Sequence, residues 1–82
     1  MNNSVRDSKN ELAKAKLPDM QKAMNSDATV YYEGRPYYIQ ALRLPKSSLY
    51  GGAVYQAELV STDPRHWNSV IIVAMEKVEL EP

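Results

Sequence analysis

The stretch YYEGRPYY, residues 31–38, constrains the fold more than any other part of the chain. Strand-forming tyrosines lie on both sides of Glu33-Gly34, and glycine readily adopts the positive φ that a two-residue hairpin loop requires. We therefore predict a β-hairpin that closes between Tyr32 and Arg35. Because the side chains of a strand alternate between two faces, the position of this turn also predicts which tyrosines point the same way.

The predicted register places Tyr31 opposite Pro36 in a non-hydrogen-bonded pair. The missing N–H of Pro36 then points away from its partner strand, which suits a sheet edge. Each adjacent tyrosine pair is split between the two faces. The more apolar set, expected in the core, is Val30, Tyr32, Tyr37 and Ile39. The other set, expected either as a binding surface or as the floor beneath a helix, is Tyr31, Tyr38 and Leu42.

The residues before the hairpin have a helical pattern. Ser8 and Glu11 have the spacing of a capping box. An apolar stripe with spacings of three and four follows at Ala13, Leu17, Met20 and Met24. We predict a disordered segment over residues 1–7 and a helical segment over residues 8–25, which Pro18 either kinks or divides. The stripe would cover a sheet or, alternatively, dock against another chain.

Four further patterns complete the predicted β-structure. With the hairpin strands at residues 29–32 and 37–44, strict alternation predicts a half-buried strand over residues 53–61. The run VIIVAM, residues 70–75, is apolar on both faces and is expected to be the most buried strand. The tripeptide MEK predicts one 3₁₀ turn, and the alternation around Val78 and Leu80 predicts a fifth strand.

The chain, 82 residues long, is therefore expected to form one α+β domain over residues 8–82 that is mainly β. The helical segment would precede a five-stranded antiparallel SH3-like small barrel or roll over residues 28–81. The segment VIIVA-MEK-VEL resembles the end of SH3-like barrels, in which a strand, a 3₁₀ turn and a short last strand close the barrel. This resemblance concerns the fold and implies no particular function.

The chain is also similar to short uncharacterised proteins encoded by phages and prophages of Gram-positive bacteria. The resemblance rests on a V-x-Y-x-G-x-x-Y hairpin and a late NSV-I-V…VE segment. The corresponding residues are Val30, Tyr32, Gly34 and Tyr37, followed by Asn68, Ser69, Val70, Ile72, Val73, Val78 and Glu79. This likeness implies a phage or prophage context and brings no activity with it.

Composition limits the function classes. Ten basic residues balance ten acidic ones, whereas a dedicated nucleic-acid-binding domain usually carries a basic excess. Since there is no cysteine, disulfides, thiolate zinc sites and thiol nucleophiles are excluded, and we expect a cytoplasmic protein. The longest apolar run is too short to span a bilayer, so no membrane association is expected.

Catalytic groups are sparse. His66 is the single histidine, in a segment expected to be an exposed loop, and no two carboxylates are placed to share a proton. Ser47, Ser48 and Ser69 have no nearby base. No cluster has the spacing of a metal site. We therefore expect no enzymatic activity, no metal and no cofactor.

Two functions remain open at this point. The first is a small binding or adaptor module that acts through protein contacts, because Arg65 and Trp67 are residue types enriched at binding hot spots. Trp67 would then contact a partner, or it would instead cap one end of the barrel. The candidate partner-binding residues are Tyr31, Arg35, Tyr38, Tyr50, Arg65, His66 and Trp67. The protein would be a monomer or a weak homodimer.

The alternative is a weak single-stranded nucleic-acid-binding small barrel, which would combine stacking aromatic side chains with a basic groove. Stacking would come from Tyr31, Tyr38, Tyr50 and Trp67. Phosphate contacts would come from Arg35, Arg43, Lys46 and Arg65.

Overall fold

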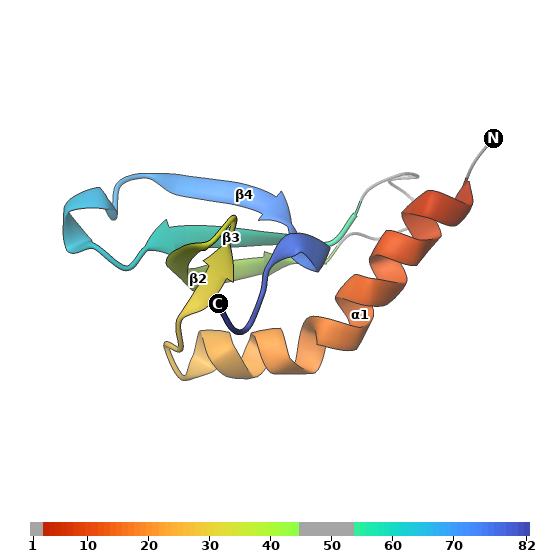
Figure 1. Ribbon diagram of the computed structural model, residues 1–82, viewed down its shortest axis with the longest axis horizontal. Helices are drawn as coiled ribbons and strands as arrows, with labels where there is room; N and C mark the ends of the chain where they lie inside the picture. Colours follow the sequence, from red (N-terminus) through yellow and green to blue (C-terminus); the bar gives the residue numbers. More distant parts are fainter. Residues whose placement is uncertain (1–2, 45–53) are drawn as a thin grey trace.

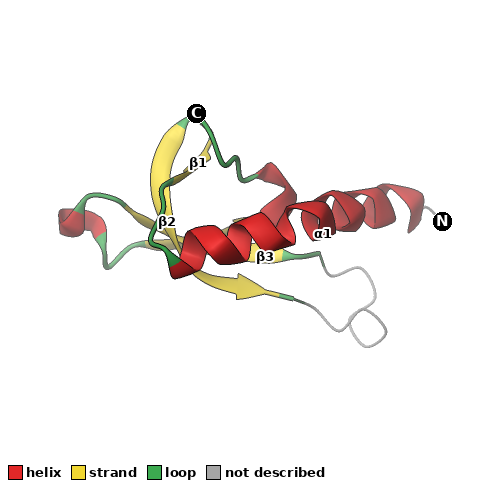
Figure 2. Ribbon diagram, turned by 90° about the horizontal axis from the view of Figure 1, so that it is seen from below, coloured by secondary structure: helices red, strands yellow, loops and turns green. Residues whose placement is uncertain are grey.

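One helix packs on one face of a four-stranded antiparallel sheet (Figures 1 and 2). The computed structural model describes residues 3–44 and 54–82, with residues 3–10 described as backbone only. The strands lie in the order β1-β2-β3-β4. The elements are α1 (Asn3–Asn25), β1 (Val30–Tyr32), β2 (Arg35–Arg43), β3 (Gln56–Ser61), the 3₁₀ turn η1 (Pro64–His66), β4 (Val70–Ala74) and the 3₁₀ turn η2 (Met75–Lys77).

Helix α1 is longer than the sequence pattern indicated. It begins at Asn3, so Ser8 lies inside the helix and the predicted capping box at Ser8 is wrong. Residues 3–7, expected to be unstructured, continue the helix. Pro18 does not divide it, because α1 runs through this residue to Asn25. Figure 1 shows the helix changing direction near its middle, as expected where proline removes one backbone hydrogen bond.

The predicted apolar stripe of α1 covers the sheet. Ala13, Met20 and Ala23 are buried, and Leu17 and Met24 pack against the same core. The remaining buried residues come from the sheet, η2 and the segment after it: Val30, Ile39, Ala57, Leu59, Val73, Met75 and Val78. The described chain thus has one core, between the sheet and the layer formed by α1 and η2.

The hairpin register is confirmed residue by residue. Val30 pairs with Tyr37, Tyr31 with Pro36 and Tyr32 with Arg35. Glu33 and Gly34 both have positive φ, at 52° and 77°, as in a tight type I′ loop. Strand β2 as a whole lies between β1 and β3, but Pro36 precedes the pairing with β3 and therefore has a locally free edge, as predicted. The β2–β3 ladder begins at the next residue, so no strand hydrogen bond is required from Pro36.

A register shift in β2 changes one predicted face. The pairing with β3 is interrupted between Ile39 and Ala41, so Gln40 is an extra residue in the strand. Beyond this bulge Leu42 pairs with buried Ala57 and packs against the core. The prediction that Leu42 shares a face with Tyr31 and Tyr38 is therefore wrong.

Strand β3 ends at Ser61 as predicted but begins at Gln56, and residue 53, its expected start, lies outside the described residues. Strand β4 corrects a more important expectation. It was predicted to be the most buried strand, yet Val70 is 40% and Ile72 is 47% exposed. The reason is its position at the end of the strand order, with a core on one face of the sheet only.

The predicted fifth strand and closed barrel are also wrong. The MEK tripeptide forms η2 as expected, but the following segment makes only one bridge to β1. In this bridge Tyr31 and Glu79 exchange two backbone hydrogen bonds of 2.8 Å. The Lys16 ammonium group of α1 donates to the carbonyl oxygens of Glu76 and Val78, each at 2.8 Å. The apolar–polar alternation around Val78 reflects the burial of its side chain in the core and does not mark a strand paired over several residues.

Candidate functional site

The segment after β3 forms a hydrogen-bonded turn, residues 62–69, at one end of the sheet. Asp63 caps η1: its Oδ1 accepts from the backbone N–H of Arg65 at 3.0 Å, and its carboxylate accepts from Nε and Nη2 of the same side chain. The Asp63 N–H donates to Ser61 Oγ, and the indole Nε1–H of Trp67 donates to the Ser61 carbonyl, both at 3.0 Å. The side-chain hydrogen bonds from Arg65 lower the pKa of the Asp63 carboxyl.

Two predicted site residues of this turn, His66 and Trp67, line different cavities. Trp67 lines a shallow cavity of about 430 Å³ with Tyr38, Ile39, Gln40, Val60 and Asp27. His66 instead lines a pocket of about 500 Å³ that does not include Trp67. The candidate residues therefore do not converge on a single site.

The first surface, here called the outer apolar face, lies on the side of the sheet that does not carry the core. The register aligns Tyr38, Val60 and Val70 in one row across three strands, and places Ile72 in the next row opposite Glu58. With Trp67, which is 54% exposed, the face consists of Tyr38, Val60, Trp67, Val70 and Ile72. Neighbouring apolar side chains thus span β2, β3 and β4.

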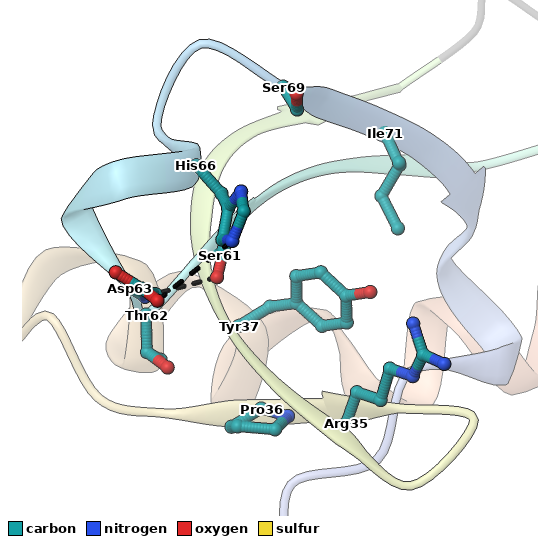
Figure 3. A pocket seen from close by; sticks show the side chains of 9 residues that line it. All are labelled: Arg35, Pro36, Tyr37, Ser61, Thr62, Asp63, His66, Ser69 and Ile71. Carbon is teal, nitrogen blue, oxygen red and sulfur yellow. Dashed lines mark hydrogen bonds and ion pairs between the residues drawn. The ribbon is translucent and has the colours of Figure 1, made fainter.

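The second surface, here called the end pocket, lies beside the hairpin (Figure 3). Its lining residues are Arg35, Pro36, Tyr37, Ser61, Thr62, Asp63, His66, Ser69 and Ile71. Figure 3 shows the Tyr37 ring between Ile71 and Arg35, with His66 and Asp63 at the other end. Tyr37 and Ile71 also pack against the core, so the pocket has an apolar floor and a polar rim.

Two of the candidate arginines are ion-paired. Arg43 Nε lies 3.1 Å from Glu58 Oε1, and Arg65 Nη2 lies 2.7 Å from Asp63 Oδ2. Within residues 11–44 and 54–82, Arg35 has no ion-pair partner. Arg35 lines the end pocket, whereas Tyr38 and Trp67 belong to the outer apolar face. Lys46 and Tyr50, two further candidates, lie outside the described residues.

The tyrosines divide as predicted for the hairpin faces. Tyr32 and Tyr37 pack against the core, and burial, together with neighbouring Glu33, raises the pKa of Tyr32. Tyr31 and Tyr38 are half-buried on the opposite face. The helix packs on the core side with Val30 and Ile39, so the suggestion that Tyr31 and Tyr38 form its floor is wrong.

Trp67 is not a buried cap, because more than half of its surface is exposed. Its indole N–H is nevertheless fixed by Ser61, so the ring is exposed but held in place. Val60, Val70 and Ile72 were missing from the predicted site. For Val70 and Ile72 the signal was the run VIIV, residues 70–73, which is apolar at every position and equally consistent with a strand buried on both faces.

Comparison with protein-family models, with curated proteins and with solved structures finds no match for the chain. Among the described residues, no helix is long and apolar enough to cross a membrane. The same part of the chain contains no group of three or more His, Cys, Asp or Glu residues that could hold a metal ion. The functional argument therefore rests on the two surfaces.

Proposed function

We propose that the protein is a small non-enzymatic binding module that acts through protein contacts, and that the outer apolar face is its contact surface. The observation that carries this proposal is the exposure of Val70, Ile72 and Trp67 beside Tyr38 on one side of the sheet. Contiguous apolar patches on soluble proteins commonly mark interaction sites. A cytoplasmic location and a phage or prophage origin are part of the same proposal.

The position of Trp67 supports this assignment. Tryptophan is enriched among the residues that dominate binding energy. Its contribution to affinity is larger when the side chain is already held in place, because ordering a side chain on binding costs free energy. The hydrogen bond to Ser61 and the Asp63–Arg65 pair hold the turn before any partner arrives. Recognition through this ring therefore has a reduced entropic cost.

A weak single-stranded nucleic-acid-binding function is less well supported. That mode requires free cations beside stacking aromatic side chains. Arg43 and Arg65 are paired with carboxylates, and Arg35 lies in the end pocket, away from Trp67. Nucleic-acid binding through the outer apolar face would therefore have to break existing ion pairs.

Site-specific photo-crosslinking tests the proposed contact surface. A photoreactive phenylalanine analogue is placed at Ile72, and in a matched control at Leu12, which is 55% exposed on α1. In cells of the source organism, we expect the probe at position 72 to give discrete adducts with another protein, and the probe at position 12 to give none. The same adducts should disappear when Trp67→Ala is added.

Two results would contradict the proposal. Equal crosslinking from positions 72 and 12 would show that the outer apolar face has no special role. Adducts with RNA or DNA, together with binding that weakens steeply as salt is added, would instead favour the nucleic-acid alternative.

A further inference from the structure

Within residues 3–44 and 54–82, the outer edge of β4 lacks charges, proline, bulges and a paired strand. Natural sheets protect their edges with charged residues, proline, bulges or a covering segment. Strand β4 has the sequence VIIVA, with no charge and no proline, and its pairing with β3 is regular. Within residues 3–44 and 54–82, no strand pairs with its outer side.

The direction of the β4 backbone groups follows from the hydrogen bonds already present. The Met75 N–H donates to the Tyr55 carbonyl at 2.9 Å, and the register then pairs Val73 with Ala57 and Ile71 with Leu59. In an antiparallel ladder, hydrogen-bonded and non-hydrogen-bonded pairs alternate. Ile71 and Val73 therefore bond to β3, whereas the N–H and C=O groups of Val70 and Ile72 point toward the open edge.

We propose that a second copy of this chain pairs with this edge, β4 against β4, in an antiparallel two-fold dimer centred on Ile72. The two Ile72 residues would exchange N–H···O=C bonds across the axis, and Val70 would lie opposite Ala74 of the second copy. This arrangement uses the outward backbone groups of both chains and joins the two sheets into one of eight strands.

The sequence of β4 suits a two-fold axis at Ile72. A two-fold interface is isologous, so a residue on the axis meets its own copy, and a charge there would face a like charge. None of the five residues is charged, and the chain has no net charge. The pairing places β-branched side chains opposite each other at the centre and a small alanine opposite Val70, and such apolar cross-strand pairs are stabilising.

The dimer would be weak and would enlarge the outer apolar face. One short strand pair buries less area than the standard interface of about 800 Å² per partner, so association is expected only at raised concentration. The two outer apolar faces would become continuous, with both Ile72 side chains at the centre. The pairing itself depends only on the strand edge and does not rest on the proposed partner binding.

Sedimentation of the full chain over micromolar to millimolar concentration tests the proposal, with three variants. Ile72→Pro removes an outward N–H together with the isoleucine side chain but none of the hydrogen bonds to β3, and proline is tolerated where the N–H of an edge strand is not used. Ile72→Thr keeps this N–H and the β-branched shape, and Leu12→Ser removes an equally exposed apolar side chain elsewhere. We expect dimers in the unmodified chain, Leu12→Ser and, more weakly, Ile72→Thr. Ile72→Pro should dimerise about tenfold more weakly or worse.

Amide hydrogen exchange provides a readout that does not depend on the proline variant folding. In the unmodified chain the Val70 and Ile72 amides should become protected as concentration rises, while the protection of Ile71 and Val73 stays constant. A monomer at every concentration would overturn the proposal and leave the edge for a strand of another protein. A dimer that persists in folded Ile72→Pro, or that leaves the Ile72 amide unprotected, would overturn it as well.

Discussion

The two edges of the sheet differ in whether another segment of the described chain covers them. At the β1 edge, Tyr31 exchanges two hydrogen bonds with Glu79, and Lys16 of α1 fixes the segment that carries Glu79. At the β4 edge, the described chain provides no such cover, and Val70 and Ile72 remain exposed. Figure 1 shows the C-terminal segment running beneath the sheet on the side of α1, away from the outer side of β4.

This difference separates the residues that stabilise the fold from those available for recognition. The fully buried side chains include Met20 of α1, Met75 of η2 and Val78 of the following segment, so the closed side contributes much of the core. On the open side, exposed apolar residues lie beside a turn held by hydrogen bonds. Substitutions on the closed side should therefore change stability, and those on the open side should change association.

The largest expected effect compares two apolar residues three positions apart. Met75→Ala empties a site that is fully buried, and we expect a loss of about 2–5 kcal/mol in the free energy of unfolding. Ile72→Ala removes a side chain that is 47% exposed and should cost about 1 kcal/mol or less. Urea unfolding followed by circular dichroism measures both. Equal losses for the two variants would contradict the division between a closed and an open side.

The next effect tests how the β1 edge is closed. Lys16→Met keeps most of the apolar stem but removes the donor to the Glu76 and Val78 carbonyl oxygens. Hydrogen bonds from a charged donor are stronger than neutral ones, so we expect a loss of about 1–3 kcal/mol. Faster amide exchange at Tyr31 and Glu79 should accompany this loss, because the bridge would open more often.

Lys14→Met is the matched control for Lys16→Met. Lys14 is exposed and lies 3.8 Å from exposed Glu11 one turn away, and such surface pairs contribute little. We expect its stability to stay within about 0.5 kcal/mol of the unmodified chain. A similar loss in both variants would show that the charge of α1, and not the contact with the C-terminal segment, is responsible.

The sequence could predict those features of the fold that have a local signal. The hairpin register depends on a local turn at Glu33-Gly34, and it was predicted correctly. The helical stripe was predicted because its period directly reports one buried face. The bulge at Gln40 has no comparable local signal, and it reversed the predicted side of Leu42.

The errors in the candidate site have a common physical origin. Whether a strand is buried or exposed depends on what packs against it, and a run such as VIIV is compatible with both. The predicted fifth strand failed for the same reason, since a strand requires a neighbour over its length and this segment meets β1 at one residue pair. Trp67, Tyr38 and Arg35 were identified as candidates from residue type, but only the fold shows that Arg35 lies apart from the other two.

The smallest effect concerns the turn on the open side and its dependence on pH. The Arg65 side chain lowers the pKa of the Asp63 carboxyl below the usual aspartate value of about 3.9. Because the folded-state pKa lies below the unfolded value, the carboxylate stabilises the folded turn fully above the unfolded value. This contribution is lost as the pH falls through the folded-state pKa.

The Trp67 indole N–H resonance is a suitable probe, since this N–H donates from the turn to the carbonyl of Ser61 at the end of β3. We expect it to shift in acid with a midpoint below the usual aspartate pKa. Arg65→Gln should move this midpoint upward, toward the ordinary aspartate value, because the first cause of the lowered pKa is removed. A midpoint unaffected by Arg65→Gln would mean that the Asp63–Arg65 pair does not hold the turn. The order of Trp67 would then have to come from its bond to Ser61 alone.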